Sequence, residues 1–175
     1  MGSPRKQRKR YSTPSHPWQS VRIKEEKELV KQYGLKNKRE IWKMASLLKN
    51  FQRQAKRLIA EKSPQAEREK KQLIDRLVRM GLIKATADLN AILNLTLKDV
   101  MDRRLQTIIY KKGFAKSTHQ ARQFIVHEHI LVGNKKITIP SYLVLSGEEL
   151  QISFAPNSKL TAEAHPERII AEKKN

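Results

Sequence analysis

Basic and hydrogen-bonding side chains recur at short intervals between residues 103 and 154, where a basic segment leads to Gly113 and a second one follows Ser117. Lysine and arginine neutralise phosphates, and hydroxyl, amide and imidazole groups bond to phosphates, sugars and bases. The apolar residues between them keep first a helical and then a strand spacing, so one face can bury a core. These residues predict a small module that buries a core on one face and binds structured RNA with the opposite face.

A helix is predicted to begin at Ser117, because a serine followed by Gln120 has the pattern of a capping box. Its exposed N-terminus offers unpaired N–H groups and a partial positive charge, and Lys116 stands just before it. We therefore predict phosphate binding at residues 116–117. Helical spacing places Ala121, Phe124 and Ile125 on the core side, and His119, Arg122 and Gln123 on the opposite side.

Two strands are predicted after this helix, at residues 130–132 and 137–139. Gly133 and Asn134 between them tolerate the backbone angles of a hairpin turn. Residues 151–154 alternate polar and apolar side chains, which predicts a strand that closes a small antiparallel sheet. The lysines expected to project from the hairpin are Lys135 and Lys136.

Residues 21–102 are predicted to form a helical domain. An apolar stripe from Ile41 to Ile59 repeats every three or four residues, and Asn37 with Glu40 resembles a capping box in front of it. Ser63 with Pro64 predicts the start of a second helix, folded back on the first as an antiparallel hairpin. Further helix starts are expected at Thr86 and Thr96, and Gly81 ends the second helix. The basic outer face includes Lys38 and Arg39.

The chain of 175 residues carries a formal net charge of +20, which favours a polyanionic partner. Residues 1–24 hold seven lysines and arginines and no acidic residue, so residues 1–20 are predicted to be a basic extended arm that becomes ordered on RNA. A solvated tail without a role is the alternative. The candidate contacts of the arm are Arg5, Lys6, Arg8, Lys9 and Arg10.

Other classes of function are less compatible with these residues. The apolar runs are too short to span a membrane, and the absence of cysteine excludes disulfides and thiolate metal sites. His127 and His129 would point the same way on a strand, but a third and fourth metal ligand are not evident. There is no phosphate-loop or dinucleotide pattern and no remainder of ~100–150 residues for a catalytic domain. We therefore predict no enzyme activity, no cofactor and no metal.

Residues 103–154 resemble the S-four RNA-binding fold, through RRL at 103–105, GFAKS at 113–117 and the segments 121–123, 127–130 and 139–144. The blocks YGLKNKREIW at 33–42 and LNAILNLTLKDVMDRRLQ at 89–106 extend the resemblance to the small-subunit ribosomal protein S-four family, in its archaeal and eukaryotic form. It covers nearly the whole chain. The fold class expected is α+β: a helical N-terminal half (21–102), a module (103–154) of two helices on a short antiparallel sheet, and a C-terminal tail (155–175).

This resemblance implies a structural constituent of the cytoplasmic small ribosomal subunit. Such a protein binds the 5′ domain of the small-subunit rRNA at a multi-helix junction and nucleates assembly. It also implies a position near the path by which mRNA enters, beside the small-subunit proteins of the S-three and S-five families. The RNA-facing residues carried over by position are Arg103, Arg104, Lys112, Lys116, Ser117, His119, Arg122, Gln123, His127 and Lys135.

Two departures from the family pattern concern the RNA-facing side. Bacterial relatives often carry a zinc-binding cysteine cluster near the N-terminus, and this chain has no cysteine. Many relatives have His-Gly-His where this chain has Glu128 between two histidines, which argues against a phosphate contact at Glu128. An assembly factor of pre-rRNA processing, which also resembles this family, is the alternative function, and a general RNA chaperone would leave the helical half unexplained.

Overall fold

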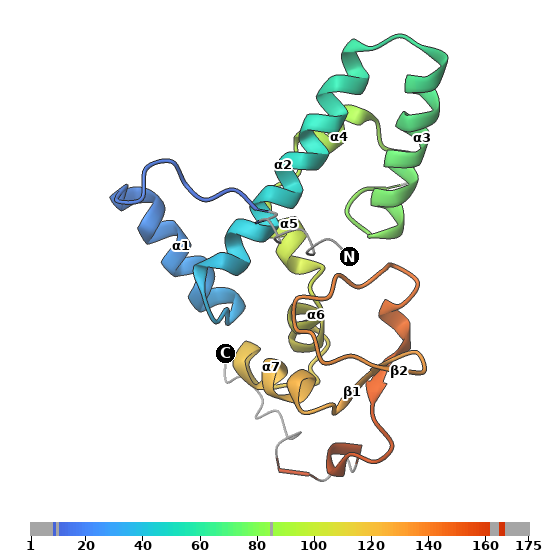
Figure 1. The fold of residues 1–175 in the computed structure, drawn as a ribbon. Coiled ribbons are helices and arrows are strands. Elements are labelled where there is room, and N and C mark those ends of the chain that lie inside the picture. The colour runs from blue at the N-terminus through green and yellow to red at the C-terminus, as the bar shows by residue number, and fades with distance from the viewer. Residues whose placement is uncertain (1–8, 10, 85, 162–164, 167–175) are drawn as a thin grey trace, which may run out of the picture.

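The computed structural model describes residues 9, 11–84, 86–161 and 165–166. Helices dominate the N-terminal part of the chain, and a small sheet lies in the C-terminal part (Figure 1). The elements are α1 (Ser20–Tyr33), α2 (Lys38–Ala60), α3 (Pro64–Arg79), α4 (Leu89–Leu93), α5 (Leu97–Asp102), α6 (Leu105–Lys111), α7 (Thr118–Val126), β1 (Ile130–Val132), β2 (Lys135–Lys136), the 3-10 turn η1 (Glu149–Gln151), β3 (Ile152–Phe154) and the 3-10 turn η2 (Lys159–Thr161). The predicted α+β class is confirmed.

The long helix α2 and the helix α3 form the predicted antiparallel hairpin (Figure 1). The Ser63 hydroxyl caps α3 by accepting a hydrogen bond from the Ala66 N–H, and Pro64 occupies the first turn, where its missing N–H costs nothing. Phe51, Leu77 and Ile92 are buried in the core between α2, α3 and α4. The turn that connects α2 and α3 lies at the end of the hairpin far from the module (Figure 1).

A second apolar cluster joins α1, the first turns of α2 and α5. It is built around Tyr33, Leu35, Ile41 and Met101. Thr96 caps helix α5, as expected. Thr96 and Asp99 form a capping box, because the Thr96 hydroxyl accepts from the Asp99 N–H and the Asp99 carboxylate accepts from the Thr96 N–H. The cluster therefore lies where the helical half meets the rest of the chain.

The module has its own core, in which α6 and α7 pack against the sheet. The sheet is antiparallel with the strand order β2-β1-β3, and the pairs Val132–Lys135 and Val132–Ile152 fix its register. Gly113 and Gly133 adopt positive φ angles of 76° and 60°, as the predicted turns require. Leu160 of η2 packs into the same core.

Three sequence predictions about local structure are wrong. The second strand is at Lys135–Lys136 and not at residues 137–139, because the turn contains only Gly133 and Asn134. Helix α4 starts after Asp88, so Thr86 is not a helix cap. Asn37 does precede α2, but its side chain makes no capping hydrogen bond.

Candidate nucleic-acid interface

The start of α6 is held against residues 140–144 by backbone hydrogen bonds. The Leu105 N–H donates to the Tyr142 carbonyl at 2.8 Å, and the Val144 N–H donates to the Arg103 carbonyl at 3.0 Å. Arg104, between these two bonded residues, forms an isolated antiparallel bridge with Leu143. This pairing fixes the backbone that directs the Arg104 side chain into the protein, where the residue is 1% exposed.

Arg104 is paired with Glu40 of the helical half. The Glu40 carboxylate accepts a hydrogen bond from Arg104 through Oε2 and another from Arg122 Nη2 through Oε1, the latter at 3.0 Å. Burial alone would raise the pKa of Glu40, but the Arg122 hydrogen bond and the Arg104 charge lower it below its ordinary value. The prediction that Arg104 faces RNA is therefore wrong in this structure: its charge is compensated inside the protein.

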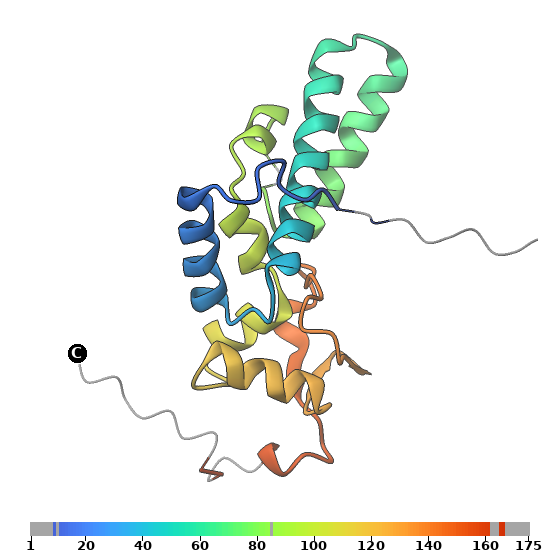
Figure 2. The same cartoon turned by 60° about the vertical axis from the view of Figure 1, so that its left-hand side comes forward.

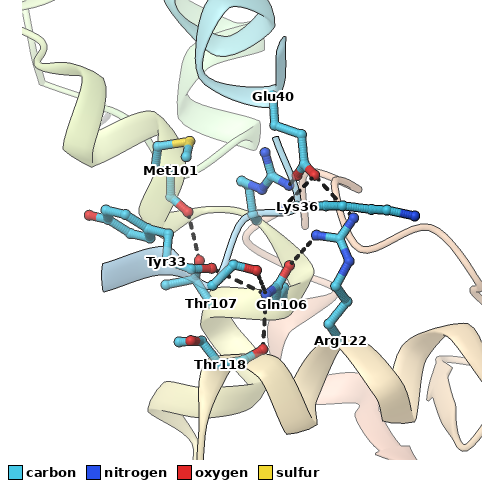
Figure 3. A network of polar contacts seen from close by, with 10 residues as sticks. Tyr33, Lys36, Glu40, Met101, Gln106, Thr107, Thr118 and Arg122 are labelled. Carbon is cyan, nitrogen blue, oxygen red and sulfur yellow. Dashed lines mark hydrogen bonds and ion pairs between the residues drawn. The ribbon is translucent and has the colours of Figure 1, made fainter. Parts of the chain in front are cut away.

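Gln106 lies beside this ion-pair group and connects three segments (Figure 3). Its side-chain N–H groups donate to the carbonyls of Tyr33 at 3.2 Å, Gly34 at 3.0 Å and Thr118 at 2.9 Å. Its carbonyl accepts from Arg122 at 3.4 Å. We call the set Tyr33, Gly34, Glu40, Arg104, Gln106, Thr118 and Arg122 the inter-half junction.

Gly34 allows the two halves to approach closely in this junction. It ends α1 with φ 60°, and its N–H donates to the Val30 carbonyl. A Cβ atom at this position would lie 2.5 Å from Thr118 Oγ1 and 3.0 Å from the Gln106 amide nitrogen. Only glycine satisfies both the left-handed backbone and the space available.

The remaining candidate RNA-binding residues of the module differ in how exposed they are. Arg103 is half-buried, with ion pairing to Glu149 at 2.7 Å and a hydrogen bond to the Val144 carbonyl, and Arg122 is half-buried in the junction. Lys112 is exposed, and its ammonium group bonds to the Glu149 carbonyl. The exposed candidates are Lys116, Ser117, His119, Gln123, His127, Lys135 and Lys136.

The predicted cap at Ser117 is confirmed for α7, but the Gln120 side chain bonds to the residue before the cap. The Ser117 hydroxyl accepts from the Gln120 N–H at 3.1 Å, and Gln120 Oε1 accepts from the Lys116 N–H at 2.6 Å. Ala121, Phe124 and Ile125 are buried in the module core. The predicted division of this helix into a core face and a polar face is therefore confirmed, and His119 and Gln123 are left in solvent.

The segment between α7 and β1 contains an unusual backbone. Glu128 has φ 62°, and within the described part of the chain it is the one non-glycine residue with positive φ. Such a conformation is strained for a residue with a Cβ atom. A glycine would adopt the same φ without this strain. The Glu128 carboxylate lies 3.7 Å from Lys136 on the hairpin.

The two histidines beside Glu128 have different surroundings. His129 Nδ1 lies 2.9 Å from the Ser158 hydroxyl and its ring contacts Phe124 edge-on, whereas His127 is exposed. Within the described residues no group of three or more potential ligands could hold a metal ion. Likewise, no helix in that part of the chain combines the length and hydropathy needed to cross a membrane.

The candidates in the helical half lie near the start of α2 and in the arm. Lys38 pairs with the buried Glu26 at 3.2 Å, and Arg39 is exposed. Lys9 is exposed, and its ammonium group lies 5.0 Å from the centre of the Tyr11 ring. The arm residues Arg5, Lys6, Arg8 and Arg10 lie outside the described residues.

Sequence reasoning missed the role of Glu40 and Gln106. The sequence predicts Glu40 to be the partner of Asn37 in a helix cap, but its carboxylate accepts from the Lys36 N–H at 3.3 Å instead. Its ion pairs, however, join residues 64 and 82 positions apart. The one available signal was an acidic residue and an amide inside the two blocks, 33–42 and 89–106, that carry the family resemblance.

Comparison with known proteins identifies the class of domain in the C-terminal part of the chain. The model of the S4 domain matches residues 103–150, which hold α6, α7 and the sheet up to β3. The small ribosomal subunit protein uS4 of Methanococcus aeolicus is 53% identical over 169 residues, covering 96% of each chain. The proteins of the same name from Methanococcus maripaludis strains C5 and C7 are each 47% identical over 172 residues, covering 98% of this chain and 97% of the relative. The chain therefore belongs to the uS4 family, in its archaeal form.

Proposed function

We propose that this protein is a structural component of the small ribosomal subunit that binds small-subunit rRNA and acts without catalysis. The observation that carries the proposal is the near full-length identity to uS4 proteins, combined with exposed cations on both halves. A ribosomal component works in the cytoplasm. The mechanism is electrostatic and geometric: lysines and arginines neutralise phosphates and release counterions, while the shape of the protein selects a folded junction.

The exposed cations that support this proposal lie on different elements of the module. Lys116 precedes α7, and Lys135 and Lys136 form the short strand β2. The inter-half junction holds α7 against α1 and α2, so these charges keep a fixed position relative to Arg39 on α2. A rigid set of separated charges can discriminate one RNA shape from another, whereas a flexible polycation cannot.

The decisive experiment is a binding titration of the full chain on a 5′-domain transcript of small-subunit rRNA, over a range of salt concentrations. A large-subunit rRNA domain of equal length is the control RNA. We expect preference for the small-subunit transcript, and replacement of Lys135 by alanine should reduce the log–log salt slope by about 0.7–0.9. The matched control is Lys62→Ala, at the exposed turn between α2 and α3. Equal binding to both RNAs would contradict the proposal and support the alternative of a general RNA chaperone.

The assembly-factor alternative is tested in cells. Crosslinking of the tagged chain followed by sequencing should recover mature small-subunit rRNA, concentrated in its 5′ domain. Recovery confined to precursor rRNA would instead assign the protein to pre-rRNA processing.

We further propose contacts with small-subunit proteins of the S-three and S-five families and with mRNA where it enters. Support comes from the family resemblance and from exposed cations on α2. Arg53 is exposed there, whereas Arg57 is engaged by Glu61 and Glu69. Charge reversal at Arg53 should therefore slow translation through structured messages more than reversal at Arg57. Unchanged translation with the Arg53 variant would remove it from the proposal.

The division of the chain into an arm (1–20), a helical domain (21–102), a module (103–154) and a tail (155–175) is likewise proposed. Separate apolar clusters around Phe51 and around Leu105 support a boundary near residues 102–103. Limited proteolysis should release fragments that end near this boundary only when the inter-half junction is broken, for example by Glu40→Ala.

A further inference from the structure

Trp18 is 91% exposed, immediately before α1, and Val21 one turn later is also exposed. Single exposed apolar residues are common on protein surfaces and need no explanation by themselves. What distinguishes Trp18 is that the segment leading to it is attached to α1 and α2 at two places.

Arg22 holds the residues directly before Trp18. Its guanidinium donates through Nη2 to the carbonyls of His16 at 2.9 Å and Pro17 at 2.8 Å, and through Nη1 to Glu26 at 2.5 Å. Glu26 is buried and also accepts from the Trp42 indole N–H at 3.0 Å. Arg22 thus connects the turn that presents Trp18 to α1 and α2.

The other end of this segment is attached to the middle of α2. The Tyr11 ring stacks on Trp42 with the centroids 6.5 Å apart, and the Ser12 N–H donates to the Ser46 hydroxyl at 3.0 Å. Figures 1 and 2 show the segment as a dark-blue arch from α2 to the start of α1. Residues 12–17 are therefore fixed at both ends, and Trp18 leaves the arch into solvent.

The charge of the sequence around Trp18 indicates the class of its partner. Residues 1–24 contain seven lysines and arginines and no acidic residue, so this stretch of the chain favours a polyanion. Indole rings form favourable stacks with unpaired bases, and such stacking tolerates any base. We propose that Trp18 is a stacking platform for an unpaired base of the rRNA, a contact that rests on the proposed function.

The test compares Trp18→Ala, Trp18→Phe and the wild-type full chain on the same 5′-domain transcript. Loss of one stack predicts a dissociation constant about 5- to 160-fold larger for the alanine variant, as for single base–aromatic contacts. The phenylalanine variant should retain most of the affinity. The salt slope should stay unchanged in both, because no phosphate contact is lost.

Leu150→Ala is the matched control, since Leu150 is 89% exposed on the module, and its affinity should equal that of the wild type. Binding of the transcript should also quench more fluorescence in the wild type than in Trp18→Phe. Full affinity and equal quenching with the Trp18 variants would overturn the stacking proposal and leave the proposed function intact. A wild-type chain that does not prefer this transcript would overturn both.

Discussion

Arg122 Nη2 lies 3.0 Å from Glu40 Oε1, although the two residues are 82 positions apart in the chain. Glu40 also pairs with the buried Arg104, so one carboxylate of the helical half forms ion pairs with two guanidinium groups of the module. The relationship makes Arg122 a connection between the halves. Its cation is consequently less available to RNA than the exposed lysines are.

Removal of the Glu40 carboxylate should destabilise the protein strongly. Glu40→Gln leaves Arg104 buried without a compensating charge, which predicts a loss of about 3–5 kcal/mol in the free energy of unfolding. Urea titration followed by circular dichroism measures it. The control is Glu61→Gln, whose exposed pair with Arg57 at 3.6 Å predicts a loss of less than about 1 kcal/mol. Equal losses in the two variants would contradict a structural role for Glu40.

The ion pairs of Glu40 also predict that the stability of the protein depends on pH. The folded-state pKa of Glu40 is lowered, so its stabilising contribution is complete above the unfolded pKa of about 4.3 and is lost as the pH falls through the lower folded value. Wild-type stability should therefore decline more steeply than that of Glu40→Gln below about pH 4. Urea midpoints measured from pH 6 to pH 3 test this, and parallel curves would count against it.

Gly34 should not tolerate a side chain. Gly34→Ala combines φ 60° with a Cβ atom 2.5 Å from Thr118 Oγ1, so a loss of more than about 1–2 kcal/mol is expected. Gly147→Ala is the control, because nothing lies within 4 Å of its added Cβ atom and no positive φ is present. Thermal unfolding of both variants distinguishes them, and a Gly34→Ala midpoint equal to that of Gly147→Ala would refute the close approach.

Glu128 is a position where a substitution should stabilise the protein. Replacement by glycine relieves the positive φ of 62°, worth roughly 1 kcal/mol, and removes an acidic group beside Lys136. We expect a higher midpoint in urea together with tighter RNA binding at low salt. Glu148→Gly would not share the gain, because Glu148 accepts hydrogen bonds from Tyr142 and the Leu145 N–H.

Arg122 and Lys135 should separate structural from RNA-binding roles. Arg122→Ala should lower the free energy of unfolding, since Glu40 and Gln106 both lose a partner. Lys135→Ala should leave stability unchanged within about 0.5 kcal/mol and reduce the salt slope of RNA binding. Measuring both quantities for both variants completes the comparison. If the Arg122 variant kept full stability and showed a reduced salt slope of RNA binding, Arg122 would be assigned to the RNA-binding face.

Local features of the fold were predictable because their causes are local. The caps at Ser63, Thr96 and Ser117 depend on residues within one turn, and the buried face of α7 follows from helical spacing. The position of β2 was missed because Ile137–Ile139 has more strand-like composition than two lysines, and the two-residue turn overrides composition. The length of the turn and the pairing with β1 therefore decided the position of that strand.

The interface was only partly predictable for a different reason. Charge and residue type identify the cations of the module, and most of them are exposed. Arg103 and Arg104 look identical in sequence, yet a one-residue step turns the second one toward Glu40. No periodic pattern marks an ion pair between residues 64 positions apart, so only the three-dimensional structure separates the two arginines.

The inter-half junction also determines when, during synthesis of the chain, the two halves can become oriented. The chain is synthesised from its N-terminus, so the carbonyls of Tyr33 and Gly34 exist long before Gln106, which is 72 positions beyond Gly34. Helices α1 to α3 can form early, but Glu40 acquires both of its partners only once Arg122 has emerged. The relative orientation of the two halves is thus set late in synthesis. A chain truncated before residue 106 would contain the helical half but would lack Gln106 and the later residues that orient the module.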